Sequence, residues 1–273
     1  MRIFCILLRD LKNFKKLIKN LNLKTLPLFF KEPILMRRLI IHLSGQFYVE
    51  NKTLYFKLPN SMTFKIKNTG IIDTINEIFF FNNYTFHSAD EYTVIDIGMN
   101  TGVASIFFSS FSNIKKVYAF EPFKKTFEYA LENFKLNINT EKIAPFNYGI
   151  SDKNESVSAN CGGLASPGAT ITPAYTKSSE IINVKSIEYI FDVILKNNNN
   201  KILLKMDCEG SEYEIFKIMN AKNYLADITI IMLEYHKGEQ ELLEILDKHG
   251  FTSLLTGKKS CDSGMLYAFK GIK

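Results

Sequence analysis

From residue 91 onward, short apolar runs alternate with amphipathic runs, and this rhythm constrains the fold more than any other feature of the chain. The short runs are rich in β-branched and aromatic residues and predict strands, whereas apolar residues spaced three and four apart predict helices. Repeated strand–helix units require a mostly parallel sheet with helices on both faces. We predict strands at 92–97, 116–120, 143–150, 201–206 and 228–233, and helices at 102–111, 123–137, 186–195, 211–219 and 239–249.

The end of the chain breaks this alternation. Residues 252–255 and 265–269 read as two strands with no helix between them, which favours an antiparallel pair. The sequence therefore predicts an α/β, Rossmann-like fold whose seven-stranded sheet is mostly parallel and has one antiparallel strand.

Residues 1–90 follow a different pattern and predict an N-terminal accessory segment before a main domain at 91–273. The accessory segment is expected to hold an amphipathic helix at 1–22, a β-hairpin or small meander at 46–67 and a short helix at 71–83. A long connection at 151–185 does not fit a short strand–helix loop, and we interpret it as a substrate-side loop.

Positive charge is concentrated at the N-terminus. Residues 1–40 hold ten Lys and Arg and two acidic residues, while the remainder holds 24 and 26. The main domain therefore lacks the excess of basic residues that nucleic-acid binding requires, and we expect no nucleic-acid partner. The basic amphipathic helix has two open interpretations, which are packing on protein, including a second subunit of a homo-oligomer, and peripheral contact with a membrane.

The remaining features predict a cytoplasmic protein. No apolar run reaches the ~20 residues that span a bilayer, and Ile3–Leu8 is too short for a signal peptide. The four cysteines, at 5, 161, 208 and 261, form no CxxC pair.

The turn from Asp96 to Gly102 is the first candidate ligand site. A strand ends at Asp96, and Gly98 and Gly102 bracket a tight turn into a helix. The spacing D-x-G-x-x-x-G lacks the third glycine of the dinucleotide pattern, which seats a pyrophosphate. S-adenosylmethionine has no phosphate, and Asp96 and the backbone around Gly98 would offer polar partners to its aminoacyl tail. The alternative is a structural turn without a ligand.

Acidic and hydroxyl residues after the next two strands extend this candidate site. Glu121 closes the second strand and is positioned to accept hydrogen bonds from both ribose hydroxyls of a nucleoside. Ser151 and Asp152 follow the third strand and would meet the adenine edge, unless they form a simple turn.

The fourth and fifth strands end in a group of charged residues, which are Lys205, Asp207, Glu209, Glu234 and His236. Such residues after an apolar strand are costly unless they meet partners or a ligand, and the carboxyl ends of neighbouring strands meet at one crevice. We therefore take all five as candidate catalytic residues, with Asp207 also facing the cofactor. A helix-capping role for Glu209 or Ser211 is the alternative.

If the ligand is S-adenosylmethionine, the reaction is a methyl transfer, and a hydroxyl acceptor would require a base that removes its proton. The first choice for the general base is His236, because its usual pKa lies nearest neutral pH, and Asp207 or Glu209 is the second choice. We predict no required metal, although the carboxylates leave Mg²⁺ open as an alternative.

From about residue 70 to the C-terminus, the chain resembles the FkbM family of methyltransferases. The resemblance rests on Asp96–Gly102 with Asn100, on Phe120-Glu121-Pro122, on Ser151-Asp152, on the string from Lys205 to Glu212, and on Glu234. It implies the methyltransferase version of the Rossmann-like fold and S-adenosylmethionine-dependent O-methylation of a small-molecule or glycan acceptor, often a sugar or a glycosylated metabolite. Met99 departs from the small residue common at this position, and residues 1–45 lie outside the resemblance.

Two other functions remain open. An NAD-linked sugar-modifying oxidoreductase would share the ribose-binding acid, but the missing third glycine argues against it. A non-catalytic, methyltransferase-like binding subunit would not need to retain the charged string that begins at Lys205.

Overall fold

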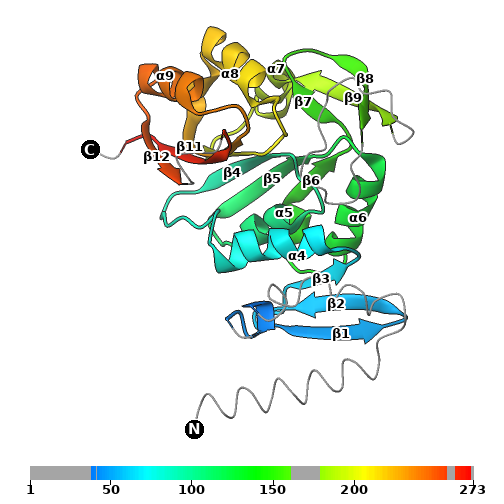
Figure 1. The fold of residues 1–273 in the computed structure, drawn as a ribbon. Helices are drawn as coiled ribbons and strands as arrows, with labels where there is room; N and C mark the ends of the chain where they lie inside the picture. Colours follow the sequence, from blue (N-terminus) through cyan, green and yellow to red (C-terminus); the bar gives the residue numbers. More distant parts are fainter. Residues whose placement is uncertain (1–37, 41, 161–178, 257–261, 272–273) are drawn as a thin grey trace.

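The computed structural model describes residues 38–40, 42–160, 179–256 and 262–271. The helix expected at residues 1–22 lies outside these ranges, as does the middle of the loop expected at 151–185. Figure 1 shows a central sheet with helices on both faces and a smaller sheet, β1 to β3, beyond α4.

The main sheet has seven strands in the order β12-β13-β11-β10-β4-β5-β6. Six neighbouring pairs join it, and β13 runs antiparallel to both β11 and β12 while the other pairs are parallel. The predicted mostly parallel sheet with one antiparallel strand is therefore confirmed. The strands are β4 (Tyr92–Ile97), β5 (Ile114–Phe120), β6 (Ile143–Phe146), β10 (Lys201–Met206), β11 (Ile228–Tyr235), β12 (Thr252–Thr256) and β13 (Gly264–Phe269).

The helices divide between the two faces of this sheet (Figure 1). On one face lie α4 (Thr69–Ile75), η1 (Asn76–Phe80), α5 (Val103–Ser109) and α6 (Lys124–Phe134), with the 3-10 turn η2 (Thr140–Lys142) before β6. On the other face lie α7 (Ile187–Tyr189), η3 (Ile190–Ile194), α8 (Glu212–Ala221) and α9 (Gln240–Lys248), with η4 (Tyr224–Asp227) before β11. None of the described helices is both long enough and apolar enough to cross a membrane.

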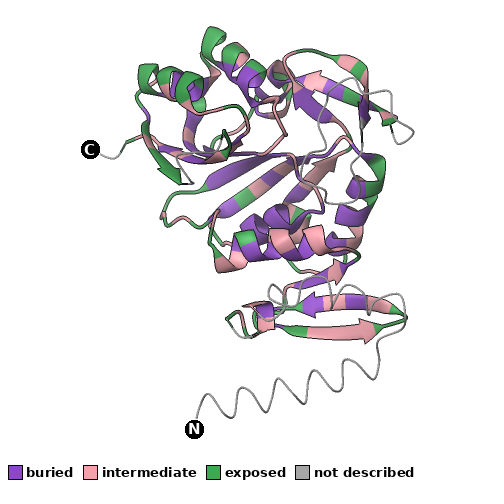
Figure 2. Cartoon of the chain, viewed as in Figure 1, coloured by how far each residue is buried: buried purple, intermediate pink, exposed green. Residues whose placement is uncertain are grey.

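Side chains alternate along the central strands and pack into two separate cores. Leu203 of β10 belongs to the core under α4 and α5, whereas Leu204 and Met206 belong to the core under α8 and α9. Figure 2 shows the central strands buried along most of their length, as expected for a sheet covered on both faces.

The predicted meander is a three-stranded antiparallel sheet of β1 (Gln46–Glu50), β2 (Thr53–Lys57) and β3 (Thr63–Ile66). Its attachment to α6 is polar as well as apolar. The Oδ1 of Asn137 accepts from Thr63 N at 2.8 Å, and the Oδ1 of Asn133 accepts from Lys65 N at 3.0 Å. The same Asn133 donates to Thr101 O, so that one buried amide joins the small sheet to the turn after β4.

The core under α4 also crosses the expected boundary at residue 90. Ile71, Ile72, Ile75 and Ile78 are buried together with Val94 of β4 and with residues of α5. Helix α4 and η1 thus complete one face of the main sheet.

Two expectations for the middle of the chain were wrong. The strand expected at 143–150 is two strands, β6 and β7 (Gly149–Ser151), which belong to different sheets. The chain turns between them at Asn147, whose side chain donates to Glu121 O at 2.9 Å. The segment expected as a loop contains β8 (Glu155–Asn160) and β9 (Ser179–Ser186), which form a second three-stranded sheet with β7 because alternating apolar residues such as Ile182 and Val184 are buried.

Candidate functional site

Apart from Ser151 and Asp152, the predicted site residues lie at or just after the carboxyl ends of strands that are neighbours in the sheet, in the order β11, β10, β4 and β5. Their carboxyl ends therefore form one continuous edge. The residues after β4 and β5 make up one half of the site, and the residues after β10 and β11 make up the other.

The turn after β4 is held tightly by the chain itself. Gly98 has a φ of +80°, and a Cβ on it would lie 1.8 Å from the carbonyl oxygen of Asp207. The amides of Gly98 and Met99 both donate to Phe120 O, at 3.1 and 2.9 Å. Gly102 also has a φ of +80°, and a Cβ there would lie 2.6 Å from the ring of Phe134. Both glycines are therefore required by close packing within the protein.

Asp96 lies beneath this turn rather than on its surface. Its side chain has no exposed area, accepts from Ser105 Oγ at 2.5 Å and pairs with Lys205 Nζ at 3.0 Å. The same ammonium group donates to Gly98 O at 2.7 Å. Burial, the largest single effect, would lower the pKa of Lys205, but the charges of Asp96 and Asp207 and the hydrogen bond to Asp96 act together to raise it, so Lys205 remains a cation that fixes the turn.

Glu121 connects the turn after β4 to the start of the segment after β5. Its Oε2 accepts from Asn100 N at 3.0 Å and its Oε1 accepts from Phe123 N at 2.9 Å. Burial raises the pKa of Glu121 to about 7, although these two hydrogen bonds act in the opposite direction. The carboxylate is thus held in one orientation at the point where strand β5 ends.

Asn100 brings a further polar group to this edge. Its φ is +52°, and its Oδ1 is buried with no hydrogen-bond partner among the described residues. Buried polar atoms are nearly always paired, so an isolated acceptor at a strand end is a candidate ligand contact.

Ser151 and Asp152 lie at the end of β7, in the second three-stranded sheet rather than in the main sheet. Ser151 Oγ donates to Asp152 Oδ1 at 3.0 Å, and both residues are partly exposed. The structure therefore places them in a polar turn that follows β6 by only a few residues.

Asp207, Glu209 and His236 converge from the ends of β10 and β11. One ligand atom from each lies within 4.8 Å of the others. The Nε2 of His236 is 3.5 Å from Glu209 Oε2, and its Nδ1 is 3.1 Å from Glu212 Oε1. Glu212 belongs to the same charged string as Asp207, but the sequence did not distinguish it as a site residue. It is fully buried and also accepts from Cys208 N at 3.1 Å.

The electrostatics of this group reflect burial among like charges. Burial and the neighbouring Asp207 raise the pKa of Glu234 to about 7, and burial also raises the pKa of Asp207. For His236, burial alone would lower the pKa, but the hydrogen bond to Glu212 and the surrounding carboxylates raise it to about 9. Both ring nitrogens of His236 face carboxylates, so the imidazole in this arrangement is a proton donor to its neighbours.

Two residues of the N-terminal segment reach the same group. The Tyr84 ring centroid lies 5.9 Å from Lys205 Nζ, and burial together with the charges of Asp207 and Glu234 raises the pKa of Tyr84. Burial and the charge of Asp207 likewise raise the pKa of Glu77. No motif marks either residue in the sequence, because only the packing of η1 and of the segment after it brings them to the site.

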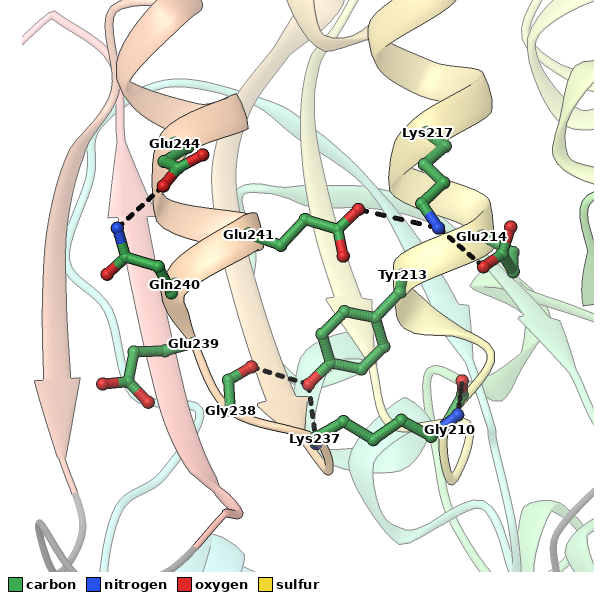
Figure 3. Close-up of a pocket in the computed structure, with 10 residues that line it drawn as sticks. All are labelled: Gly210, Tyr213, Glu214, Lys217, Lys237, Gly238, Glu239, Gln240, Glu241 and Glu244. Carbon is green, nitrogen blue, oxygen red and sulfur yellow. Dashed lines mark hydrogen bonds and ion pairs between the residues drawn. The ribbon is translucent and has the colours of Figure 1, made fainter.

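A separate hollow of about 580 Å³ lies between α8 and α9. It adjoins the site through Gly210 and Lys237, the chain neighbours of Glu209 and His236. Figure 3 shows Lys217 between two glutamates on its wall, and Tyr213 Oη bonded to the backbone of Gly238 and Lys237.

Comparison with known proteins gives one family and several distant structures. Residues 96–253 match the model of the methyltransferase FkbM domain. A comparison with curated proteins gives no match.

The similar solved structures include the FkbM methyltransferase of Methylobacillus flagellatus KT, with 15% identity and a TM-score of 0.47 over 70% of this chain. This chain spans 46% of the length of that one. The precorrin-6y C5,15-methyltransferase of Geobacter metallireducens GS-15 has 12% identity and a TM-score of 0.41, over 71% of this chain and 89% of that one. TrmK of M. capricolum, in complex with S-adenosyl-homocysteine, has 15% identity and a TM-score of 0.39, over 66% and 63%.

Proposed function

Since the chain belongs to the family of methyltransferase FkbM domains, we propose that it is an S-adenosylmethionine-dependent O-methyltransferase. The acceptor in this proposal is a hydroxyl group of a sugar or of a glycosylated metabolite. The observation that carries the proposal is the pairing of Glu121 with the turn after β4 through Asn100 N.

That pairing suits a nucleoside with an aminoacyl tail. Each carboxylate oxygen of Glu121 accepts one backbone N–H and retains a second lone pair for a ribose hydroxyl. The isolated Oδ1 of Asn100 is an acceptor for the ammonium group of the tail. Bound S-adenosylmethionine supplies a methyl group on a sulfonium. Ser151 and Asp152 are assigned to the adenine edge on the strength of the family resemblance.

Asp96 and Lys205 act beneath the ligand in this proposal. Asp96 is fully buried and bonded to Ser105 and Lys205, so it positions Lys205 rather than contacting the cofactor. Lys205 in turn holds the carbonyl of Gly98, which sets the path of the turn along which the cofactor lies.

The residues after β10 and β11 face the acceptor. His236 was the first choice for the general base, but its two ring nitrogens face Glu209 and Glu212, which leaves no lone pair for a hydroxyl proton. We therefore assign proton removal to Glu234, whose side chain has no hydrogen bond within the described part of the chain, and give His236 a positioning role. Holding the acceptor in line with the methyl group supplies the rest of the catalysis.

The proposed partners follow from charge and from the resemblance. Carboxylates such as Asp207 and Glu234 accept hydrogen bonds from sugar hydroxyls and repel the phosphates of nucleic acid. Association with a second subunit or with a membrane through residues 1–22, and residence in the cytoplasm, are part of the same proposal.

Calorimetric titration tests the cofactor. We expect the purified chain to bind S-adenosylmethionine and S-adenosylhomocysteine and to have little affinity for NAD. Glu121→Ala should weaken binding about tenfold or more, because a hydrogen bond to a charged group is worth about 1.5–3 kcal/mol. Tight NAD binding without sulfonium binding would establish the oxidoreductase alternative instead.

Transfer of a labelled methyl group tests the acceptor. Cellular glycans and metabolites from cells with and without the gene are compared by mass spectrometry, and the species that differs is incubated with the chain and methyl-labelled cofactor. With that acceptor, Glu234→Gln should lower kcat at least tenfold and leave S-adenosylhomocysteine affinity within a few-fold. A normal rate for this variant would mean that Asp207 or water, and not Glu234, removes the proton.

A further inference from the structure

We propose that Asp207, Glu209 and His236 form a binding site for a divalent transition-metal cation. Cation binding follows from these side chains alone. The role of the cation, which is to hold the oxygen of the acceptor beside Glu234, rests on the proposed function.

The three side chains are arranged as a chelate. They come from two adjacent strand ends, and one ligand atom from each lies within 4.8 Å of the other two. Two oxygens or nitrogens bound to the same ion at ordinary ligand distances of about 2.0–2.2 Å stand no more than about 4.4 Å apart. The observed group is thus close to the size of a coordination sphere and needs only small side-chain rotations to close.

The imidazole is oriented by a buried carboxylate. Glu212 Oε1 lies 3.1 Å from Nδ1 of His236, and Nε2 faces Glu209 Oε2 at 3.5 Å. A cation at this site would replace the proton that Nε2 carries in the cation-free arrangement, while Nδ1 keeps its hydrogen bond to Glu212. Metal-binding histidines commonly donate their other N–H to a carboxylate in this way, because the hydrogen bond fixes the tautomer and the ring orientation.

Glu212 also provides a second observation that is independent of the three ligand atoms. The residue is fully buried, and its other oxygen, Oε2, has no hydrogen-bond partner among the residues that the structure describes. A buried carboxylate oxygen without a donor is costly unless positive charge lies nearby. The carboxylate therefore stabilises a cation held by His236.

The buried lysine beside this group, Lys205, is held by other residues. Lys205 Nζ is already bonded to Asp96 and to Gly98 O. Glu209 and Glu212 face the two ring nitrogens of His236, and Glu234 and Glu77 lie within range of the charge of Asp207. Positive charge added between Asp207 and Glu209 would relieve this repulsion, as expected for a site that accommodates a dication.

The donor set selects the class of cation. Two carboxylates and one imidazole suit Mn²⁺ and its first-row neighbours better than Ca²⁺, which takes only oxygen ligands. Three protein ligands leave coordination positions open, and a hydroxyl oxygen of the acceptor can occupy one of them.

Titration of the full-length chain with Mn²⁺, followed by electron paramagnetic resonance and calorimetry, tests the site without any acceptor. We expect one Mn²⁺ per chain, with Ca²⁺ competing poorly. Asp207→Asn, Glu209→Gln and His236→Gln should each weaken Mn²⁺ binding at least tenfold. Glu214→Gln, which alters an exposed glutamate of α8, is the matched control and should leave the affinity unchanged.

Two control measurements accompany the Mn²⁺ titration. Circular dichroism shows whether the chain is folded, and S-adenosylhomocysteine titration shows whether it binds the cofactor product. A folded chain that binds S-adenosylhomocysteine but no Mn²⁺ up to millimolar concentration would overturn the cation site and leave the methyltransferase proposal intact. An equal loss of Mn²⁺ affinity in the Glu214→Gln control would also overturn the cation site, because it would place the Mn²⁺ on the acidic surface. Mn²⁺ binding without S-adenosylhomocysteine binding would instead remove the cofactor proposal.

Discussion

At the scale of single residues, the site depends on positions where the backbone or a charge is confined. Gly98 is the clearest case, because its φ is +80° and its Cα faces the carbonyl of Asp207. Glu121 is the second, because its carboxylate is buried and bonded on both oxygens.

Gly98→Ala is expected to destabilise the fold through both effects. Positive φ costs a residue with a Cβ about 1–2 kcal/mol, and the Cβ placed 1.8 Å from Asp207 O adds an overpacking cost of about 1–3 kcal/mol. Gly238→Ala is the matched control, because Gly238 has a φ of +83° and no atom within 4 Å of an added Cβ. Urea denaturation should therefore show a larger loss for Gly98→Ala, and equal losses would mean that the turn shifts freely.

The pH dependence of cofactor affinity should follow Glu121. Its pKa is raised from the usual range to about 7, so the carboxylate is ionised above pH 7 and gains a proton as the pH falls. In the proposed complex the ionised form accepts from both ribose hydroxyls, so affinity for S-adenosylhomocysteine should fall as the pH drops from 8 to 6, by up to about tenfold per pH unit below the pKa.

The contribution of Glu121 to folding stability changes with pH in the opposite direction. Because the folded pKa lies above the unfolded one, Glu121 contributes less to folding as the pH rises from its usual pKa toward 7. Calorimetric titrations of wild type and Glu121→Gln at several pH values provide the check. An equally steep pH profile in the variant would assign the proton to another group.

At the scale of elements, strands β4 and β10 are joined by more than their ladder. Asp96 and Lys205 are direct neighbours across the two strands, and their side chains form a buried ion pair on the α5 side of the sheet. Because Lys205 also holds Gly98 O, the pair couples the strands to the turn after β4, where we propose that the cofactor binds.

Lys205→Met should destabilise the chain by about 3–5 kcal/mol, because it leaves the charge of Asp96 buried without a partner. The double variant Asp96→Asn/Lys205→Met should lose less than the sum of the two single variants. Lys217→Met is the control, since its ion pair with Glu214 is exposed and should be worth about 0–1 kcal/mol. Urea denaturation gives the free energy of unfolding for all four variants. A loss of stability in Lys205→Met that is no larger than the loss in Lys217→Met would contradict the coupling.

At the scale of the whole molecule, the N-terminal segment is part of the main core. Ile71, Ile72, Ile75 and Ile78 pack against β4 and α5, and η1 carries Glu77 toward the charged residues after β10. The segment therefore supports both the hydrophobic core and the wall of the site.

A chain that begins at residue 91 should consequently fail to unfold cooperatively. The truncation exposes the apolar residues of α5 that α4 and η1 cover in the full chain. It also removes several buried isoleucines, and the free energy that they contribute exceeds the total stability of an ordinary domain. Urea denaturation followed by circular dichroism, together with binding of a hydrophobic dye, measures the effect. A sharp transition for the truncated chain would establish 91–273 as an independent domain.

Deleting residues 1–22 addresses the partner rather than the fold. If the basic amphipathic segment packs on a second subunit, the deletion should lower the size of the protein in solution. If it lies on a membrane, the size should remain the same and binding to anionic vesicles should be lost.

The sequence by itself determined the sheet. Strands such as Tyr92–Ile97 and Lys201–Met206 are recognisable because burial on both faces requires mostly apolar residues, and the short link between the last two strands favours an antiparallel pair. Because parallel strands end at a common edge, the order of motifs along the chain also indicated that Glu121, Asp207 and His236 would meet there.

Only the tertiary structure decided what each charged group does at that edge. The position of Asp96 at a strand end predicts a ligand contact, yet Asp96 is buried against Lys205 of the neighbouring strand. The usual pKa of His236 predicts a base, yet Glu212 of the preceding helix, α8, accepts a hydrogen bond from its ring. Roles of this kind depend on distances between residues that are far apart in the chain, and local pattern carries no information about those distances.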